Sequence, residues 1–266
     1  MRLFIKHLKL LKIYIIVGWK NGTEYRKDFF ISIIDFFVSI LITIVFWSFI
    51  FDDLIIFEGW GKEELVILAL IGNTSWALSE FFAGTWSLPE KIVSGQIDKY
   101  LCRPINSLFA TIMESSQFDE VLKGFIGLLI LMNATMIIYG TYSINIVSIL
   151  LGILSLLIGV VIISLMRVTI SSLSFWLGET SSLNMILHLE DFSFERYPLD
   201  IFGKYSFIFI YFIPIGFIST IPTKIILGGT PIYKALFFEM LIFIIWLVIA
   251  TLVWKYGLKK YESYGG

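Results

Sequence analysis

Six long apolar segments constrain this chain more than any other feature of its sequence. A helix needs about 20 predominantly apolar residues to cross the hydrocarbon core of a bilayer. The six segments run over 29–51, 65–86, 121–139, 144–166, 205–221 and 232–254. We therefore predict an all-α polytopic membrane protein, with six transmembrane helices that form a single domain over residues 1–266.

The composition agrees with this class of protein. Only 15% of the residues are charged, against about 25% in soluble domains. The formal net charge of −1 gives no reason to expect a nucleic-acid partner, and membrane lipid is the expected surrounding. The fifth segment is short and contains Pro214, and a mixed stretch at 168–177 is expected to extend the fourth helix or to lie in the interface. Cys102 is the single cysteine, which excludes an intrachain disulfide and a cysteine metal cluster.

Residues 1–27 have the pattern of a basic amphipathic helix rather than of a signal peptide. Basic residues are spread through the stretch where a signal peptide has its apolar core. They fall along one face of a helix: Arg2, Lys6, Lys9 and Lys12. Such a helix lies flat at a membrane surface, so we predict an interfacial helix that leads into the first span.

The basic residues predict the orientation in the membrane. With six spans, 17 Lys and Arg lie on the side of the two termini, and three, Lys62, Lys224 and Lys234, lie on the other. Cytoplasmic loops carry the excess of Lys and Arg. Both termini are therefore predicted to be cytoplasmic, together with the connections 87–104 and 178–204. The loops 52–63 and 222–231 are predicted to be external.

The connection 87–104 is predicted to form one short helix. Ser87 and Glu90 have the spacing of a capping box, and Pro89 suits the first turn. Pro104 stops the helix near Arg103. One face of this helix is apolar, through Val93, Ile97, Tyr100 and Leu101. That face must rest on lipid headgroups or on another protein.

Four ionisable residues interrupt or border the spans: Asp35, Glu80, Arg167 and Glu239. Charged groups are costly in hydrocarbon and usually face protein or water, so each is a functional candidate. The alternatives are structural. Asp35, Glu80 and Arg167 can form an ion pair or lie near helix ends, and Glu239 can contact Lys234 or the backbone near the outer loop.

Two regions carry a family resemblance. After the second predicted span, six residues match a Gly-x-Ile-Asp-x-x-Leu-x-(Arg/Lys)-Pro signature: Gly95, Ile97, Asp98, Leu101, Arg103 and Pro104. A second region comprises Glu195-Arg-Tyr-Pro198, Phe212-Ile-Pro-Ile215 and the Ile221-Pro222 bend. With these motifs the chain resembles, over most of its length, the membrane subunit of a type-2 ATP-binding-cassette (ABC) exporter of the bacterial permease branch.

The resemblance implies a role for the helix at 87–104. In this family it is the coupling helix, which sits in a groove of the ATPase subunit. The residues expected at that contact are Leu88, Glu90, Lys91, Ile92, Gly95, Gln96, Ile97, Asp98 and Leu101. An interfacial helix that merely anchors the loop is the alternative.

The resemblance also implies the assembly. Two permease chains, identical or paralogous, work with two cytoplasmic ATPase subunits in the bacterial cytoplasmic (inner) membrane. The region 222–231 is implied to form short re-entrant helices that close the pathway outside. Asp35, Glu80, Arg167 and Glu239 become candidates for the substrate pathway or the dimer seam.

No catalytic, cofactor or metal site is predicted in this chain. It has no Gly-x-x-x-x-Gly-Lys-(Ser/Thr) loop, so ATP and Mg²⁺ are implied only in the partner ATPase. His7 and His188 are the only histidines, and neither lies beside a Ser or Cys nucleophile in sequence. The alternative function is a stand-alone channel or secondary carrier that uses the carboxylates of Asp35, Glu80 and Glu239. An intramembrane enzyme is a distant third.

Overall fold

A computed structural model describes residues 2–53, 60–137, 144–178, 180 and 197–262. These residues form helices and turns and include no strand. Within them, five helices are long and apolar enough to cross a membrane. They are α2 (Arg26–Asp53), α3 (Lys62–Ser79), α7 (Phe118–Ile137), α8 (Ile146–Ser172) and α12 (Ile232–Lys260). Five of the six predicted spans therefore correspond to long helices, although the second continues beyond α3 as the kinked η1 (Glu80–Thr85). Helix α8 with α9 (Ser174–Leu177) includes the mixed stretch after the fourth span.

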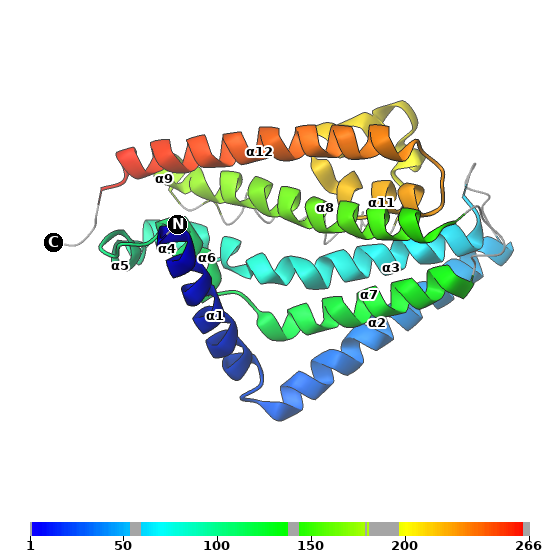
Figure 1. The fold of residues 1–266 in the computed structure, drawn as a ribbon, viewed down its shortest axis with the longest axis horizontal. Helices are drawn as coiled ribbons and strands as arrows, with labels where there is room; N and C mark the ends of the chain where they lie inside the picture. The colour runs from blue at the N-terminus through cyan, green and yellow to red at the C-terminus, as the bar shows by residue number, and fades with distance from the viewer. Residues whose placement is uncertain (1, 54–59, 138–143, 179, 181–196, 263–266) are drawn as a thin grey trace.

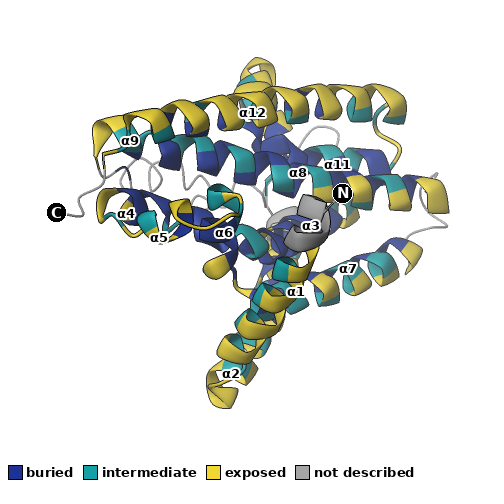
Figure 2. Cartoon of the chain, turned by 60° about the vertical axis from the view of Figure 1, so that its left-hand side comes forward, coloured by how far each residue is buried: buried dark blue, intermediate teal, exposed yellow. Residues whose placement is uncertain are grey.

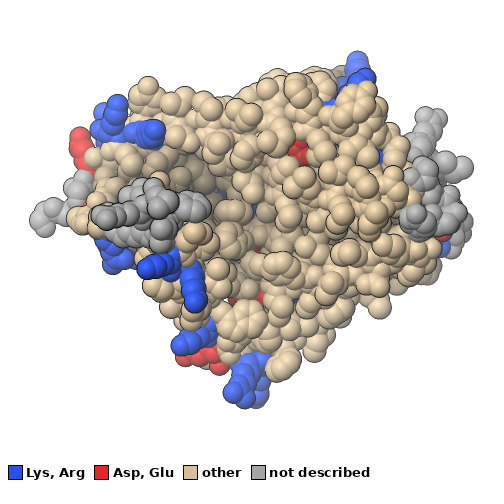
Figure 3. Space-filling model, viewed as in Figure 1, with Lys and Arg blue, Asp and Glu red and all other residues tan. Residues whose placement is uncertain are grey.

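The long helices run side by side between two ends of the molecule (Figure 1). We call one the α4 end, after α4 (Leu88–Val93), and the other the Asp200 end, after Asp200. Helix α3 runs toward the α4 end, and α7 runs away from it. Helices α8 and α12 both run toward the α4 end. Charged side chains on the face drawn in Figure 3 gather at the α4 end and along α1 (Arg2–Gly22), beside a broad belt with few charged groups.

Helix α3 is the centre of the bundle. Most of its side chains are buried, and it packs against α2, α7 and α8. The approach of α7 is close because Gly124 and Gly127 face Leu78 and Thr74 of α3, which leaves no room for a larger side chain. Small residues at such contacts let two helices in a membrane pack tightly.

Helices α2 and α12 have large exposed apolar faces (Figure 2). Phe30, Leu41 and Phe49 of α2 are exposed, as are Phe237 and Val248 of α12. Exposed apolar patches this large suit lipid or another membrane protein rather than water.

The predicted fifth span at 205–221 is not one helix. It is divided among four short elements: η3 (Leu199–Tyr205), η4 (Ile208–Phe212), η5 (Pro214–Ile218) and α11 (Thr220–Ile226). The break between η4 and η5 falls at Pro214, which follows the non-helical Ile213. Proline has no N–H to donate and cannot continue the hydrogen-bond ladder of the preceding turn. Hydropathy alone counted this segment as a span.

These elements form a hairpin, residues 199–227, that starts and ends at the Asp200 end. Its tip reaches the middle of α8, where the backbone of Phe217 lies against Gly159. The Ser75 hydroxyl of α3 donates to the Ile218 carbonyl at 2.7 Å, and the Ser148 hydroxyl donates to the Ile226 carbonyl at 3.2 Å. The two arms are joined by the Leu199 N–H, which donates to Thr220 at 3.2 Å.

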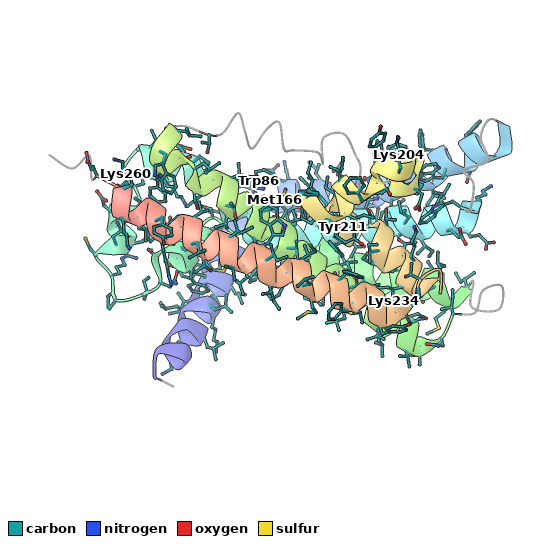
Figure 4. The ribbon with its side chains drawn as sticks, turned by 90° about the horizontal axis from the view of Figure 1, so that it is seen from above. Trp86, Met166, Lys204, Tyr211, Lys234 and Lys260 are labelled. Atoms are coloured by element: carbon teal, nitrogen blue, oxygen red, sulfur yellow. The ribbon has the colours of Figure 1, made fainter. Side chains whose placement is uncertain are left out.

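The last residues of the predicted connection 178–204 lie at the end of the bundle opposite α4. Asp200 accepts hydrogen bonds of 2.8 Å from Trp60 and from Lys224, two residues at the end of the bundle opposite α4. Lys204 accordingly lies with Lys234 and far from Lys260 (Figure 4). The sequence count placed these residues with α4 because it assumed that 205–221 crosses the membrane. With Lys204 moved to the other side and Arg196 left out of the count, fifteen basic residues stand against four, so the direction of the charge bias is unchanged. Residues 181–196, with His188, Glu195 and Arg196, lie outside the described part of the chain.

Residues 2–22 form the predicted N-terminal helix, α1. It packs against α6 (Ser107–Glu114) and the start of α7, where Gly18 faces the ring of Phe118. The ring of Tyr14 meets that of Phe109 edge to face at 6.4 Å. A turn after Gly22 leads into α2, and the location of α1 at a membrane surface stays a prediction.

Candidate functional site

The segment 87–104 folds as two short helices rather than the one predicted. Helix α4 is followed by a turn and by α5 (Asp98–Leu101). Gly95 lies in this turn with a φ of 76°, a conformation that favours glycine and commonly ends helices. Pro89 takes the predicted place in the first turn. Ser87 does not cap the helix, and its hydroxyl instead bonds Gly84 and Ser115.

The apolar face of this segment is buried inside the subunit. Leu88, Ile92, Ile97 and Tyr100 are each at most 3% exposed, and they pack against Trp254 near the end of α12. Leu88 and Ile92 are therefore not available to a partner, contrary to the prediction. A helix whose apolar side is covered by its own subunit presents the opposite side to the outside.

The outer side of the segment is mixed in character. Its exposed residues are Glu90, Val93, Ser94, Gln96, Lys99, Leu101, Cys102, Arg103 and Pro104. A groove of about 450 Å³ adjoins them, between α4, α9 and the end of α12. Val93 and Trp176 line this groove and are 37% and 44% exposed. Of the predicted contact residues, Glu90, Gln96 and Leu101 thus remain accessible.

Lys91 ties the segment to α6, a helix that was not predicted. Its ammonium group donates to the Thr111 carbonyl at 3.1 Å and to the Ser115 hydroxyl at 2.6 Å. Glu114 lies 3.5 Å from the same group and forms a 2.9 Å ion pair with the exposed Lys99. Lys91 is buried, so it fixes the segment within the subunit rather than forming a rim around a partner. The N-cap Asn106, which accepts from the Phe109 N–H at 2.9 Å, was the sequence signal for α6.

Arg167 lies within the bundle, where α8 meets the end of α3. Its guanidinium is 4.2 Å from the ring centroid of Trp86 and 5.9 Å from that of Trp76. It also donates to Ser79, at 3.4 Å, next to the buried Glu80. Aromatic rings within about 6 Å attract a cation. Arg167 also lines a cavity of about 10 Å³ below the tip of the hairpin, which has room for roughly one water.

Glu239 and Asp35 have opposite surroundings. Glu239 is 0% exposed and faces Ser155 of α8, and the contact between the two side chains falls short of a regular hydrogen bond. Asp35 is exposed on the outer face of α2. Glu80, Arg167 and Glu239 are therefore buried inside the subunit, whereas Asp35 lies on its outer surface.

The second region that carries the family resemblance is split between two parts of the fold. Tyr197 packs its ring 5.6 Å from that of Trp47, beside the Asp200 end, while Glu195 and Arg196 fall outside the described residues. Pro214 and Pro222 lie in the hairpin. In the described part of the chain, no group of three or more His, Cys, Asp or Glu side chains is placed to hold a metal ion.

In a comparison with known families, residues 37–265 match the model described as ABC-2 family transporter protein. Comparison with curated proteins finds no match. The matched range begins within α2 and contains the α4–α5 segment, the hairpin and α12.

Proposed function

The chain belongs to the ABC-2 transporter family, and on that premise we propose that it is the permease subunit of an exporter driven by a separate ATPase. In this proposal the long helices line or border the substrate pathway. The α4–α5 segment receives the force of ATP hydrolysis. The termini and this segment face the cytoplasm of a bacterial cell, because the excess of basic residues, fifteen against four with Arg196 left out, is counted on that side.

The observation that carries the proposal is how the α4–α5 segment is held. Its inner face is packed on α12, and Lys91 bonds it to α6, so the segment cannot move without its neighbours. Its outer face remains exposed. A rigid body with one fixed and one free face suits the transfer of a push from a partner to the spans.

The proposed docking face differs from the one that the family resemblance implied. It consists of Glu90, Val93, Gln96 and Leu101, together with the groove bordered by Trp176. Single charged residues at its rim contribute little, since exposed ion pairs are typically worth about 0–1 kcal/mol. The apolar Val93 and the central Gln96 are expected to contribute most.

Other parts of the assembly follow from the same premise. Two ATPase chains bind ATP and Mg²⁺, since this chain has no phosphate-binding loop of the usual kind. A second permease chain, identical or paralogous, packs against the exposed apolar faces, and Asp35 is the candidate for this seam. The hairpin 199–227 is a re-entrant plug that closes the outer side of the pathway above Arg167.

Co-purification of the ATPase tests the docking face. Val93→Asp and Gln96→Trp each lie outside the packed core, so the spans should still fold. We expect each to reduce the ATPase that co-purifies in mild detergent by about tenfold, equivalent to ~1.4 kcal/mol of binding. Tyr25→Asp is the control, because Tyr25 is exposed on the turn between α1 and α2, away from α4. Parental amounts of ATPase with both variants would leave the segment as a simple interfacial anchor.

A stand-alone carrier is the second candidate, and Glu239 is the observation that favours it. Carriers use buried carboxylates as proton or ion sites, and this one has no partner in the described residues. Liposomes that contain this chain alone separate the two functions. Uptake driven by an ion gradient without the ATPase indicates the carrier, whereas the permease requires the ATPase and ATP.

A further inference from the structure

The end of α12 is joined directly to the predicted signature region. The Tyr261 hydroxyl donates to the Asp98 carboxylate at 2.8 Å, across 163 positions of sequence. Tyr261 is the residue that ends α12, and Asp98 is the first residue of α5. Burial, together with the hydrogen bond and the negative charge of Asp98, raises the pKa of Tyr261. The phenol therefore stays protonated at neutral pH and keeps its donor.

Aromatic packing surrounds this hydrogen bond. The ring of Phe175 in α9 lies 5.9 Å from that of Tyr261 and 5.4 Å from that of Trp254. Gly257 lets α9 approach α12, since a Cβ at this position would overlap the Phe175 ring. Trp254 in turn packs against the buried face of the α4–α5 segment. We call these residues the C-terminal clamp: Asp98, Phe175, Trp254, Gly257 and Tyr261.

The clamp offers a second mechanical route from the cytoplasmic segment to the membrane. The first route follows the chain, from α4 through η1 (Glu80–Thr85) into α3. The second passes through Asp98 and Tyr261 into α12, which shares a long contact with α8. α8 also carries Arg167 and the contact with the hairpin tip. Packed elements with more than one contact move together because interiors are close-packed.

We propose that Tyr261 is a positioning residue, whose hydrogen bond to Asp98 holds the α4–α5 segment on α12 so that displacement of this segment by an ATPase also moves α12. This inference rests on the proposed function. It assigns a physical role to the aspartate of the Gly-x-Ile-Asp signature: Asp98 faces its own subunit and fixes the segment, rather than contacting the partner.

The test measures substrate transported per ATP hydrolysed in liposomes that contain permease and ATPase. Tyr261→Phe removes only the hydroxyl and keeps the ring in the clamp. We expect it to lower this ratio by about fivefold, the low end of usual coupling effects. Because Tyr261 also lines the groove beside Val93, the ratio is taken per ATPase bound, with the co-purified ATPase measured on the same sample. Tyr256→Phe is the matched control, because Tyr256 is exposed on the same helix. A merely structural role would lower expression or thermal stability without changing the ratio.

Substitutions of Asp98 keep the test decisive if Tyr261→Phe expresses poorly. Asp98→Asn retains an oxygen that can accept from Tyr261, so it should preserve more of the ratio than Asp98→Ala. The double variant Asp98→Ala/Tyr261→Phe should have no lower ratio than Asp98→Ala alone, since each substitution removes the same hydrogen bond. A parental ratio in Tyr261→Phe, or losses that add in the double variant, would overturn the inference. If the proposed function itself is wrong, the parental chain retains no ATPase. That result is distinct from a parental ratio in Tyr261→Phe and from additive losses in the double variant.

Discussion

At the scale of residues, two ionisable groups of the spans differ in whether neighbouring side chains stabilise them. Arg167 has Trp86, Trp76 and Ser79 within reach, so its charge is compensated from several sides. Glu239 faces Ser155 without a hydrogen bond. A buried polar group without a partner costs about 1–3 kcal/mol. Packing alone therefore does not account for Glu239, whereas Arg167 has a sufficient structural explanation.

We predict that Glu239→Gln lowers transport about tenfold, an effect of ~1.4 kcal/mol on the limiting barrier, while expression and thermal stability stay near parental. Gln has almost the same shape but cannot gain or lose a proton. Glu239→Leu separates stability from function, because removal of an unpartnered polar group should stabilise the fold by about 1–3 kcal/mol. Transport equal to the parent in Glu239→Gln would show that the carboxyl has no functional role.

At the scale of elements, the hairpin 199–227 depends on one close approach. Its tip passes over α8 at Gly159, where a Cβ would overlap the carbonyl of Phe217. Ser75 holds the same turn from α3 through the Ile218 carbonyl. Pro214 leaves the backbone around it without regular helical bonds, which is tolerated at membrane depth only when protein supplies the partners.

Gly159→Val should displace this tip. We predict a loss of about 1–3 kcal/mol, as for other insertions into a packed core, which corresponds to a fall in Tm of roughly 2–10 °C for a chain of this size. Tryptophan fluorescence of the purified protein in detergent measures the transition. Leu157→Val is the control on the exposed side of the same helix. Equal transitions for both variants would mean that the hairpin does not rest on Gly159.

The elements also show which parts of the fold a single sequence can predict. Five spans were located because hydropathy and length determine them; the predicted 232–254 became Ile232–Lys260. The segment 205–221 has the same hydropathy signal, and only its short length and Pro214 distinguish a hairpin from a span. The contact of Tyr261 with Asp98 has no local pattern, since it depends on how α12 packs on α4. The residues predicted to contact an ATPase include Leu88 and Ile92, which the fold buries, because the sequence does not show which side of this segment packs on α12.

At the scale of the whole molecule, the arrangement of the ends determines the topology. The α4 end gathers α4, α5, α9 and the end of α12, and the proposed partner binds there. The Asp200 end gathers Trp60, Asp200 and Lys224 in one network. If the long helices cross the membrane, residues at one end of the bundle share one side of it.

Lys204 provides the sharpest test of this topology. Loop counting from the sequence placed Lys204 on the cytoplasmic side with Gln96, whereas in the fold it lies at the end with Lys234 (Figure 4). We predict that Lys204→Cys and Gly229→Cys, on a Cys102→Ser background, react with an impermeant thiol reagent in intact cells. All these positions are exposed on the subunit, so accessibility depends on the side of the membrane. Gln96→Cys should react only after the cells are opened. If Lys204→Cys labels with Gln96→Cys instead, the stretch before the hairpin is cytoplasmic and 205–221 must cross the membrane after all.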